Sequence, residues 1–315
     1  MISRSTLIGA LVVVELAIAG AAIHSLTGDF SPRPAHALGT GGGHFGRHAG
    51  TTDRRFTTGL APHVVVEVKD VRVVVATSAG PGVRVVERIH KIGWVSGDVP
   101  RVAVEQTADG LRVTSPGGEG VHVVMGELDH LVQLTVPATA RVEVTSDDRI
   151  EASGLRAAFS AHSGDGSLHV RDQRGDLDLS TGDGALELID VRSGTVTART
   201  GDGRLTLTRV VADRLTAGTE DGRIEASDVH LAEGAITTKD GRVHLAYTPD
   251  SDATLTARTA EGRIDIPPAL GQPTADAADD GDGRHERVVR LGSGRGRFEV
   301  SSGDGSISIT QGAQV

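Results

Sequence analysis

One short pattern supplies most of the residues in this chain that could do chemistry. A hydroxyl residue, any residue, an acid and a glycine recur in SGDGSL (163–168), TGDGAL (181–186), TGDGRL (200–205), TEDGRI (219–224), TKDGRV (238–243), TAEGRI (259–264) and SGDGSI (302–307). Repeated carboxylates at glycine-rich turns are typical of calcium-binding β-coils. The aspartates that would form such a site are Asp165, Asp183, Asp202, Asp221 and Asp240.

Two features favour a structural role for these turns over a calcium site. Asp-Gly is a common tight-turn pair, because glycine accepts a positive φ and aspartate bonds to nearby backbone. An arginine, the wrong charge for a cation site, follows the glycine in four copies, at Arg204, Arg223, Arg242 and Arg263. We therefore expect no metal and no other cofactor, and calcium at the aspartates is the lesser alternative.

Residues for catalysis are scarce. The chain has no cysteine, which excludes thiolate catalysis, disulfides and zinc-thiolate sites. His162 and Ser163 are adjacent, but the equivalent turns carry no histidine and no G-x-S-x-G motif is present. The pairs Asp147–Asp148 and Asp279–Asp280 are the candidate carboxylates of a polysaccharide-acting enzyme, yet both lie in polar segments where acids are routine. We expect a protein that is not an enzyme.

The spacing of the turns predicts the fold. The closing glycines stand at 166, 184, 203, 222, 241, 262 and 305, in steps of 18, 19, 19, 19, 21 and 43 residues. A period near 19 is too short for a pair of helices and matches one coil of a strand solenoid. Aliphatic pairs alternate with polar residues on both sides of each turn, such as Leu186 and Leu188 or Val196 and Ala198, so the coils should share one interior.

We therefore expect an all-β protein whose residues 146–315 form a β-solenoid or β-helix-like stack of ~19-residue coils. The polar segment 267–286 interrupts the period and is predicted to be a loop insertion. Residues 54–145 contain further aliphatic runs separated by Gly/Pro-rich turns, which favour an antiparallel or meandering sheet. These runs are HVVVEV, VRVVVAT, VRVVERI, RVAVEQ, LRVTS, VHVVM and LVQLTVP.

The start of the chain predicts export. An apolar run covers residues 7–23 behind Arg4 and is broken only by Glu15. As a helix of roughly 25 Å it is a little short of the ~30 Å membrane core, so residues 1–25 are either a cleaved signal peptide or an uncleaved anchor. Residues 26–53 are rich in Gly, Pro and His and are predicted to be a linker. The protein should be membrane-anchored, periplasmic or on the cell surface.

The net charge of −10 argues against nucleic acid as a partner, because phosphate recognition needs a concentrated basic surface. A membrane is a partner through residues 7–23 if that segment stays uncleaved. Other partners are expected in the cell envelope: a polymer, a surface or a protein.

Three features together resemble a bacterial β-strand-repeat family of unknown function whose members carry the name of adhesins. They are the repeated T-G-D-G-x-L turns, the strand phrase LTVPATARVEVTS (134–146) and the apolar N-terminal segment. The resemblance covers residues 54–315 and implies a solenoid-like all-β fold at the cell envelope. It brings no catalytic or ligand-binding residues with it.

The favoured function is a non-catalytic, envelope-associated β-repeat scaffold or adhesin-like binding protein. Two alternatives stay open. One is a polysaccharide-acting enzyme built on a β-helix, and the other is a membrane-tethered sensor or regulator of envelope stress.

Overall fold

The computed structural model describes residues 46–96, 99–115, 122–267 and 285–312, which belong to one compact unit that begins at Gly43. Every element of regular secondary structure in these ranges is a β-strand, so the all-β prediction is confirmed. The predicted helix at 7–23 and residues 268–284 of the predicted insertion lie outside the described residues. Within the described ranges, no helix has the length and apolar character needed to cross a membrane.

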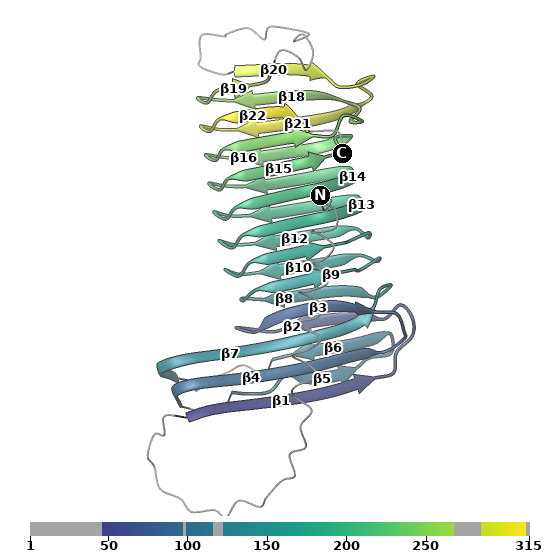
Figure 1. Ribbon diagram of the computed structural model, residues 1–315, viewed down its shortest axis with the longest axis vertical. Helices are drawn as coiled ribbons and strands as arrows, with labels where there is room; N and C mark the ends of the chain where they lie inside the picture. The colour runs from purple at the N-terminus through teal and green to yellow at the C-terminus, as the bar shows by residue number, and fades with distance from the viewer. Residues whose placement is uncertain (1–45, 97–98, 116–121, 268–284, 313–315) are drawn as a thin grey trace, which may run out of the picture. The chain divides into compact units, whose positions relative to one another are not determined.

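The strands form two ladders (Figure 1). Ladder A contains, in spatial order, β1 (Gly46–Phe56), β4 (Val83–Ser96), β7 (His122–Pro137), β3 (Arg72–Ser78), β9 (Ile150–Ser153), β11 (Leu168–Arg171), the first halves of β13 (Leu186–Thr200) and β14 (Leu205–Thr219), β15 (Ile224–Val229), β17 (Val243–Tyr247), β22 (Ile307–Gln311) and β19 (Ile264–Asp265).

Ladder B contains β5 (Ala103–Gln106), β6 (Gly110–Thr114), β2 (His63–Glu67), β8 (Arg141–Ser146), β10 (Phe159–Ser163), β12 (Leu177–Thr181), the second halves of β13 and β14, β16 (Glu233–Thr238), β21 (Gly296–Ser302), β18 (Ala253–Thr259) and β20 (His285–Arg290).

A rung of the stack is one ladder B strand, a turn and one ladder A strand. Neighbouring rungs pair in parallel, and the aliphatic pairs predicted from the sequence point into one continuous core between the ladders. Leu186, Leu188, Val196 and Ala198 are all fully buried. Each buried Leu, Ile or Val contributes about 1.5–3 kcal/mol, which is too little for one rung to fold alone. The predicted solenoid of short coils is therefore present.

The turn hydroxyls bond one rung to the next. Thr200 Oγ1 donates to the carbonyl oxygen of Gly184 in the preceding turn over 2.9 Å, and Thr181 Oγ1 donates to that of Gly166 over 2.8 Å. All seven hydroxyl residues of the repeated turns are buried, at Ser163, Thr181, Thr200, Thr219, Thr238, Thr259 and Ser302. Ser146 is an eighth such hydroxyl residue and donates to the Val71 carbonyl over 2.6 Å, although its turn has no glycine.

The turn glycines are required for close approach. An ideal Cβ on Gly203 would fall inside the van der Waals surface of the Gly184 carbonyl oxygen, and Gly222 has the same relation to Gly203. The expected positive φ at these glycines is wrong. Among the described residues, positive φ occurs only at glycines outside the repeated turns and at five non-glycine residues that include Asp172, Asp190 and Asp228. The rungs thus need glycine because there is no room for a side chain.

The last rung is inserted out of chain order. The regular steps along the sequence suggest stacking in chain order, but β21 lies between β16 and β18, and β22 lies between β17 and β19 (Figure 1). The hydroxyl bonds follow the same order, because Ser302 donates to Gly241 and Thr259 to Gly305. β20 then covers β18 as an antiparallel strand. This strand begins at His285, so the predicted loop 267–286 is too long by its last two residues.

The opposite end is built in a related way. The rung β2–β3 lies between β8–β9 and the later strands β6 and β7, and all of these pairings are parallel. The predicted antiparallel pairing holds only further out, in β1–β4–β7 and β5–β6. β1 begins at Gly46, which corrects the predicted linker 26–53 at its end. Its pairing with β4 supplies the order that the Gly-rich sequence did not indicate.

Loss of one turn hydroxyl should weaken the stack. We expect Thr200→Val to lower the free energy of unfolding by about 1–2 kcal/mol, because the buried carbonyl of Gly184 loses its donor. Urea unfolding followed by circular dichroism measures the change. Thr197→Val, on the outer face of the same strand, is the matched control and should stay within about 0.5 kcal/mol. Equal effects of the two changes would contradict the role given to the turn hydroxyl.

Gly203→Ala should cost more than the loss of a hydroxyl. The added methyl group cannot be placed without separating two rungs, and we expect at least about 2–3 kcal/mol of destabilisation in the same assay. The control is Gly59→Ala, where an added Cβ meets nothing within 4 Å and no loss is expected. A stable Gly203→Ala protein would show that the turns have room for a side chain.

Candidate functional site

The outer face of ladder A carries a row of charged side chains in register. Glu151, His169 and Glu187 stand opposite one another on β9, β11 and β13. His169 Nδ1 lies 3.0 Å from Glu187 Oε2, and Arg171 Nη2 lies 3.4 Å from the same oxygen. Period-two alternation explains the row, because the neighbours of these residues along each strand point into the core.

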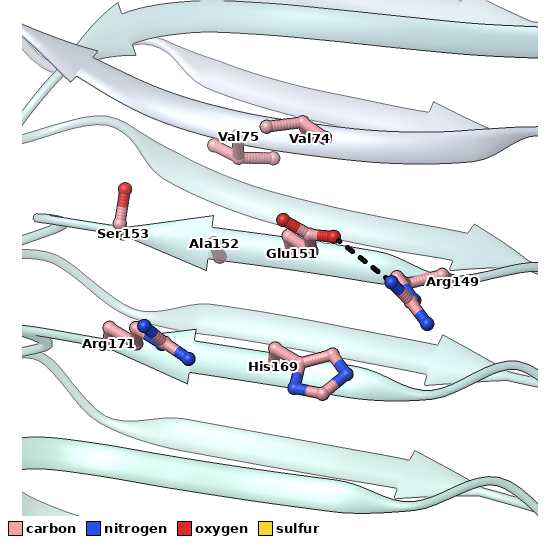
Figure 2. A pocket seen from close by; sticks show the side chains of 8 residues that line it. All are labelled: Val74, Val75, Arg149, Glu151, Ala152, Ser153, His169 and Arg171. Atoms are coloured by element: carbon pink, nitrogen blue, oxygen red, sulfur yellow. Dashed lines mark ion pairs between the residues drawn. The ribbon is translucent and has the colours of Figure 1, made fainter. Parts of the chain in front are cut away.

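A shallow hollow of about 340 Å³ lies on this face (Figure 2). It forms where the short side chains of Val74 and Ser153 stand beside longer charged ones. Arg149, Glu151, His169 and Arg171 surround it, and Arg149 Nη1 lies 3.8 Å from Glu151 Oε1. The hollow therefore presents both signs of charge and histidine on a strand surface.

The electrostatics of this hollow suit binding of polar groups. The hydrogen bond with His169, together with the charge of Arg171, holds the pKa of Glu187 below its ordinary value, so Glu187 stays ionised. In the described part of the chain, no hydrogen bond joins Ser153 to His169 across the hollow. The hollow offers carboxylate, guanidinium and imidazole groups to a partner.

The aspartates considered for calcium lie along the turn edge of the stack. Asp165, Asp183, Asp202, Asp221 and Asp240 are all exposed. No group of three or more His, Cys, Asp or Glu residues with the geometry of a metal site occurs in the described ranges. The turns bring the acids into a column but surround none of them with further ligands.

The residues considered for catalysis are separated or engaged in turns. Ser163 is fully buried and donates to the Asp148 carbonyl, whereas His162 is exposed and faces Ser180 on the outside. Asp147 and Asp148 are exposed turn residues, and Asp148 accepts a hydrogen bond from the backbone N–H of Arg149. Asp279 and Asp280 lie outside the described residues.

A buried charged cluster had no counterpart among the sequence predictions. Glu87 on β4 is fully buried, and its Oε1 accepts a hydrogen bond from the Val102 N–H over 2.7 Å and lies 3.0 Å from His130 Nε2. Its Oε2 lies 3.8 Å from Arg54 and 3.6 Å from Arg101. The sequence does contain a pattern that indicates this burial: alternation in VRVVERI puts Glu87 on the inward face with its aliphatic neighbours.

The cluster joins four segments rather than opening to a substrate. Glu87 links β4 to β1 through Arg54, to β7 through His130, and to the segment before β5 through Val102 and Arg101. Both side chains of the Glu87–His130 pair are almost completely shielded from solvent. We infer that this buried polar cluster holds the outermost strands together.

Removal of this carboxylate should destabilise the protein strongly. We expect Glu87→Ala to lower the free energy of unfolding by about 3–5 kcal/mol, because it leaves buried donors without an acceptor. The control Glu151→Ala, on the outer face, should change it by less than about 0.5 kcal/mol. Urea unfolding of both variants is the measurement. A Glu87→Ala protein with a nearly unchanged free energy of unfolding would show that the cluster does not hold the outermost strands together.

Comparison with known protein families gives a match over more than half of the chain. The sequence profile described as Toastrack DUF4097 matches residues 106–314. This match confirms the family resemblance predicted from the turns. No curated protein matches the chain.

Three solved structures are similar to the chain at low sequence identity. A putative adhesin from Parabacteroides merdae is 16% identical with a TM-score of 0.47, over 82% of this chain and 95% of that chain. A putative adhesin from Bacteroides fragilis is 12% identical with a TM-score of 0.38, over 82% and 97%. A putative cell adhesion protein from Clostridium sporogenes is 9% identical with a TM-score of 0.26, over 84% and 100%.

Proposed function

The chain belongs to the Toastrack DUF4097 family, and from this premise we propose that it is a non-catalytic, adhesin-like binding protein of the cell envelope. Its partner is an extended polymer or a protein surface that lies along the outer strand face of ladder A. Export through residues 1–25 brings it to that compartment, either anchored or released.

The observation that carries this proposal is the in-register charged row beside the hollow on ladder A. Strands repeat at about 4.8 Å, so equivalent side chains on successive rungs give many similar contacts along one direction. Each exposed charge contributes little alone, and affinity would come from their number. Arg149, Arg171 and Glu151 would make the polar contacts at the hollow.

The same face gives little support to stacking on sugar rings. The whole chain has one Trp and one Tyr, and Tyr247 is buried. Carbohydrate recognition commonly uses exposed aromatic side chains, so charged or amide-bearing envelope polymers and proteins are the favoured partner class. The enzyme alternative depends on exposed turn acids, and the sensor alternative depends on residues outside the described part.

Binding to envelope material tests the proposal. The purified full chain is incubated with sacculi, envelope polysaccharide and solubilised envelope proteins from the native organism, and saturable binding to one of them is expected. Arg149→Glu with Arg171→Glu should weaken that binding at least about tenfold and reduce its dependence on salt.

The matched control reverses two exposed arginines on ladder B, with Arg199→Glu and Arg297→Glu, and should bind like the unchanged chain. Saturable binding to none of the three fractions would refute the adhesin-like function. Equal losses in the two double variants would place the contact elsewhere than the outer face of ladder A.

A further inference from the structure

The turn edge of the stack presents two parallel columns of opposite charge. The acidic column consists, in spatial order, of Asp165, Asp183, Asp202, Asp221, Asp240, Asp304 and Glu261. The arginine column consists of Arg204, Arg223, Arg242 and Arg263. Backbone bonds fix the spacing of the second column, because Leu205 N–H donates to the Arg223 carbonyl and Ile224 N–H to that of Arg242.

The two columns do not neutralise each other within one chain. All their side chains are exposed. In the described ranges, the acidic column makes no ion pair, and in the arginine column only Arg223 makes one, with Glu225 of its own rung over 3.4 Å. Like charges on adjacent rungs, about 4.8 Å apart, repel each other even in water. An isolated chain therefore leaves a regular, uncompensated charge pattern on this edge.

The edge carries no side chains between the two columns. Its backbone consists of stacked glycine-containing turns, and Gly203, Gly222 and Gly241 stand between the two columns with no side chain. A hollow of about 510 Å³ opens where Ser306 replaces arginine next to Arg242. Directly before the acid, these turns carry a long exposed side chain at two rungs, Glu220 and Lys239, and glycine or alanine at the others.

We propose that this edge pairs with the same edge of a second copy of the chain, in parallel orientation. Rotation by 180° about an axis that runs along the columns places the acidic column of each copy opposite the arginine column of the other. Because both copies have the same rung spacing, Arg204, Arg223 and Arg242 meet the partner copy's acids rung by rung. Rotation about an axis that lies in the edge and is perpendicular to the columns would instead place acids opposite acids. Charge complementarity therefore favours the parallel arrangement.

A second copy fits this edge better than a simple polyion. A polyanion attracted to the arginine column would lie beside the acidic column, and a polycation would meet the converse problem. Only a partner with both columns neutralises both, and the interface is isologous, as in most dimers. Apart from Arg149, which has the same turn position as Arg204, this surface is different from the outer face of ladder A, so dimerisation leaves Glu151, His169 and Arg171 accessible.

The association should be dependent on salt and on these charges. Sedimentation velocity of the full chain in mild detergent is expected to show a monomer–dimer equilibrium at low salt that shifts to monomer at 0.5 M salt, a concentration at which surface charges are screened within about 5 Å. Arg204→Glu, Arg223→Glu and Arg242→Glu combined should give a monomer. Asp202→Arg, Asp221→Arg and Asp240→Arg combined should also give a monomer, and an equimolar mixture of the two variants should form a heterodimer.

Two controls separate this interface from other contacts. Arg192→Glu, Arg199→Glu and Arg297→Glu reverse the same number of exposed charges away from the edge and should leave the dimer intact. Association through the N-terminal segment would survive both salt and reversal of the turn arginines. A chain that is monomeric at low salt, or a dimer that survives reversal of the arginine column, would overturn the proposal.

Orientation can be tested with single cysteines, since the chain has none of its own. Ser167→Cys and Ser306→Cys stand at two well-separated rungs of the edge. A parallel dimer cross-links 306 to 306 and 167 to 167 with a short bifunctional maleimide. Cross-linking of 167 to 306 in a mixture of the two variants would show the antiparallel arrangement and contradict the proposal. None of these experiments uses an envelope ligand, so their result is independent of the adhesin-like function.

Discussion

The close stacking of one turn on the next is the constraint on which the rest of this structure depends. A buried hydroxyl donates to the carbonyl of the preceding turn, and a glycine leaves room for that carbonyl. The two requirements fix the distance between rungs, and that distance puts aliphatic side chains of successive strands in contact. The hydroxyl residue and the glycine of each turn are therefore needed for stacking. The acid before the glycine and the arginine after it are not.

The sequence predicted what local periodicity controls. The period of the turns and the alternation of Leu, Ile and Val gave the rungs and their inward faces, because each rung repeats the same local chemistry. It also indicated that the turns are structural, although the reason differs: the glycines serve close approach and not a positive φ. The strand β1 was missed because GRHAGTTDRRF has no aliphatic alternation, and only pairing with β4 orders it.

What the sequence could not predict is the identity of non-local neighbours. The turn that ends at Gly305 resembles every other turn, so nothing in it tells that its rung lies beside Gly241 on one side and Gly262 on the other. The charged row of the candidate binding face has the same origin. Glu151, His169 and Glu187 are ordinary outward residues in their own strands, and they become a row only through the register between strands.

The inserted rung has a consequence for how the chain reaches its native state. During synthesis or export the segment 253–265 emerges before its neighbour 296–311, and its final position is one rung away from the part already stacked. Until the later segment arrives, β16 and β17 have an open edge, and β18 can pair in its native register only with β20. Growth from one end alone cannot complete this solenoid. Its C-terminal part has to close in one cooperative step, and that step has high contact order and is expected to be slow.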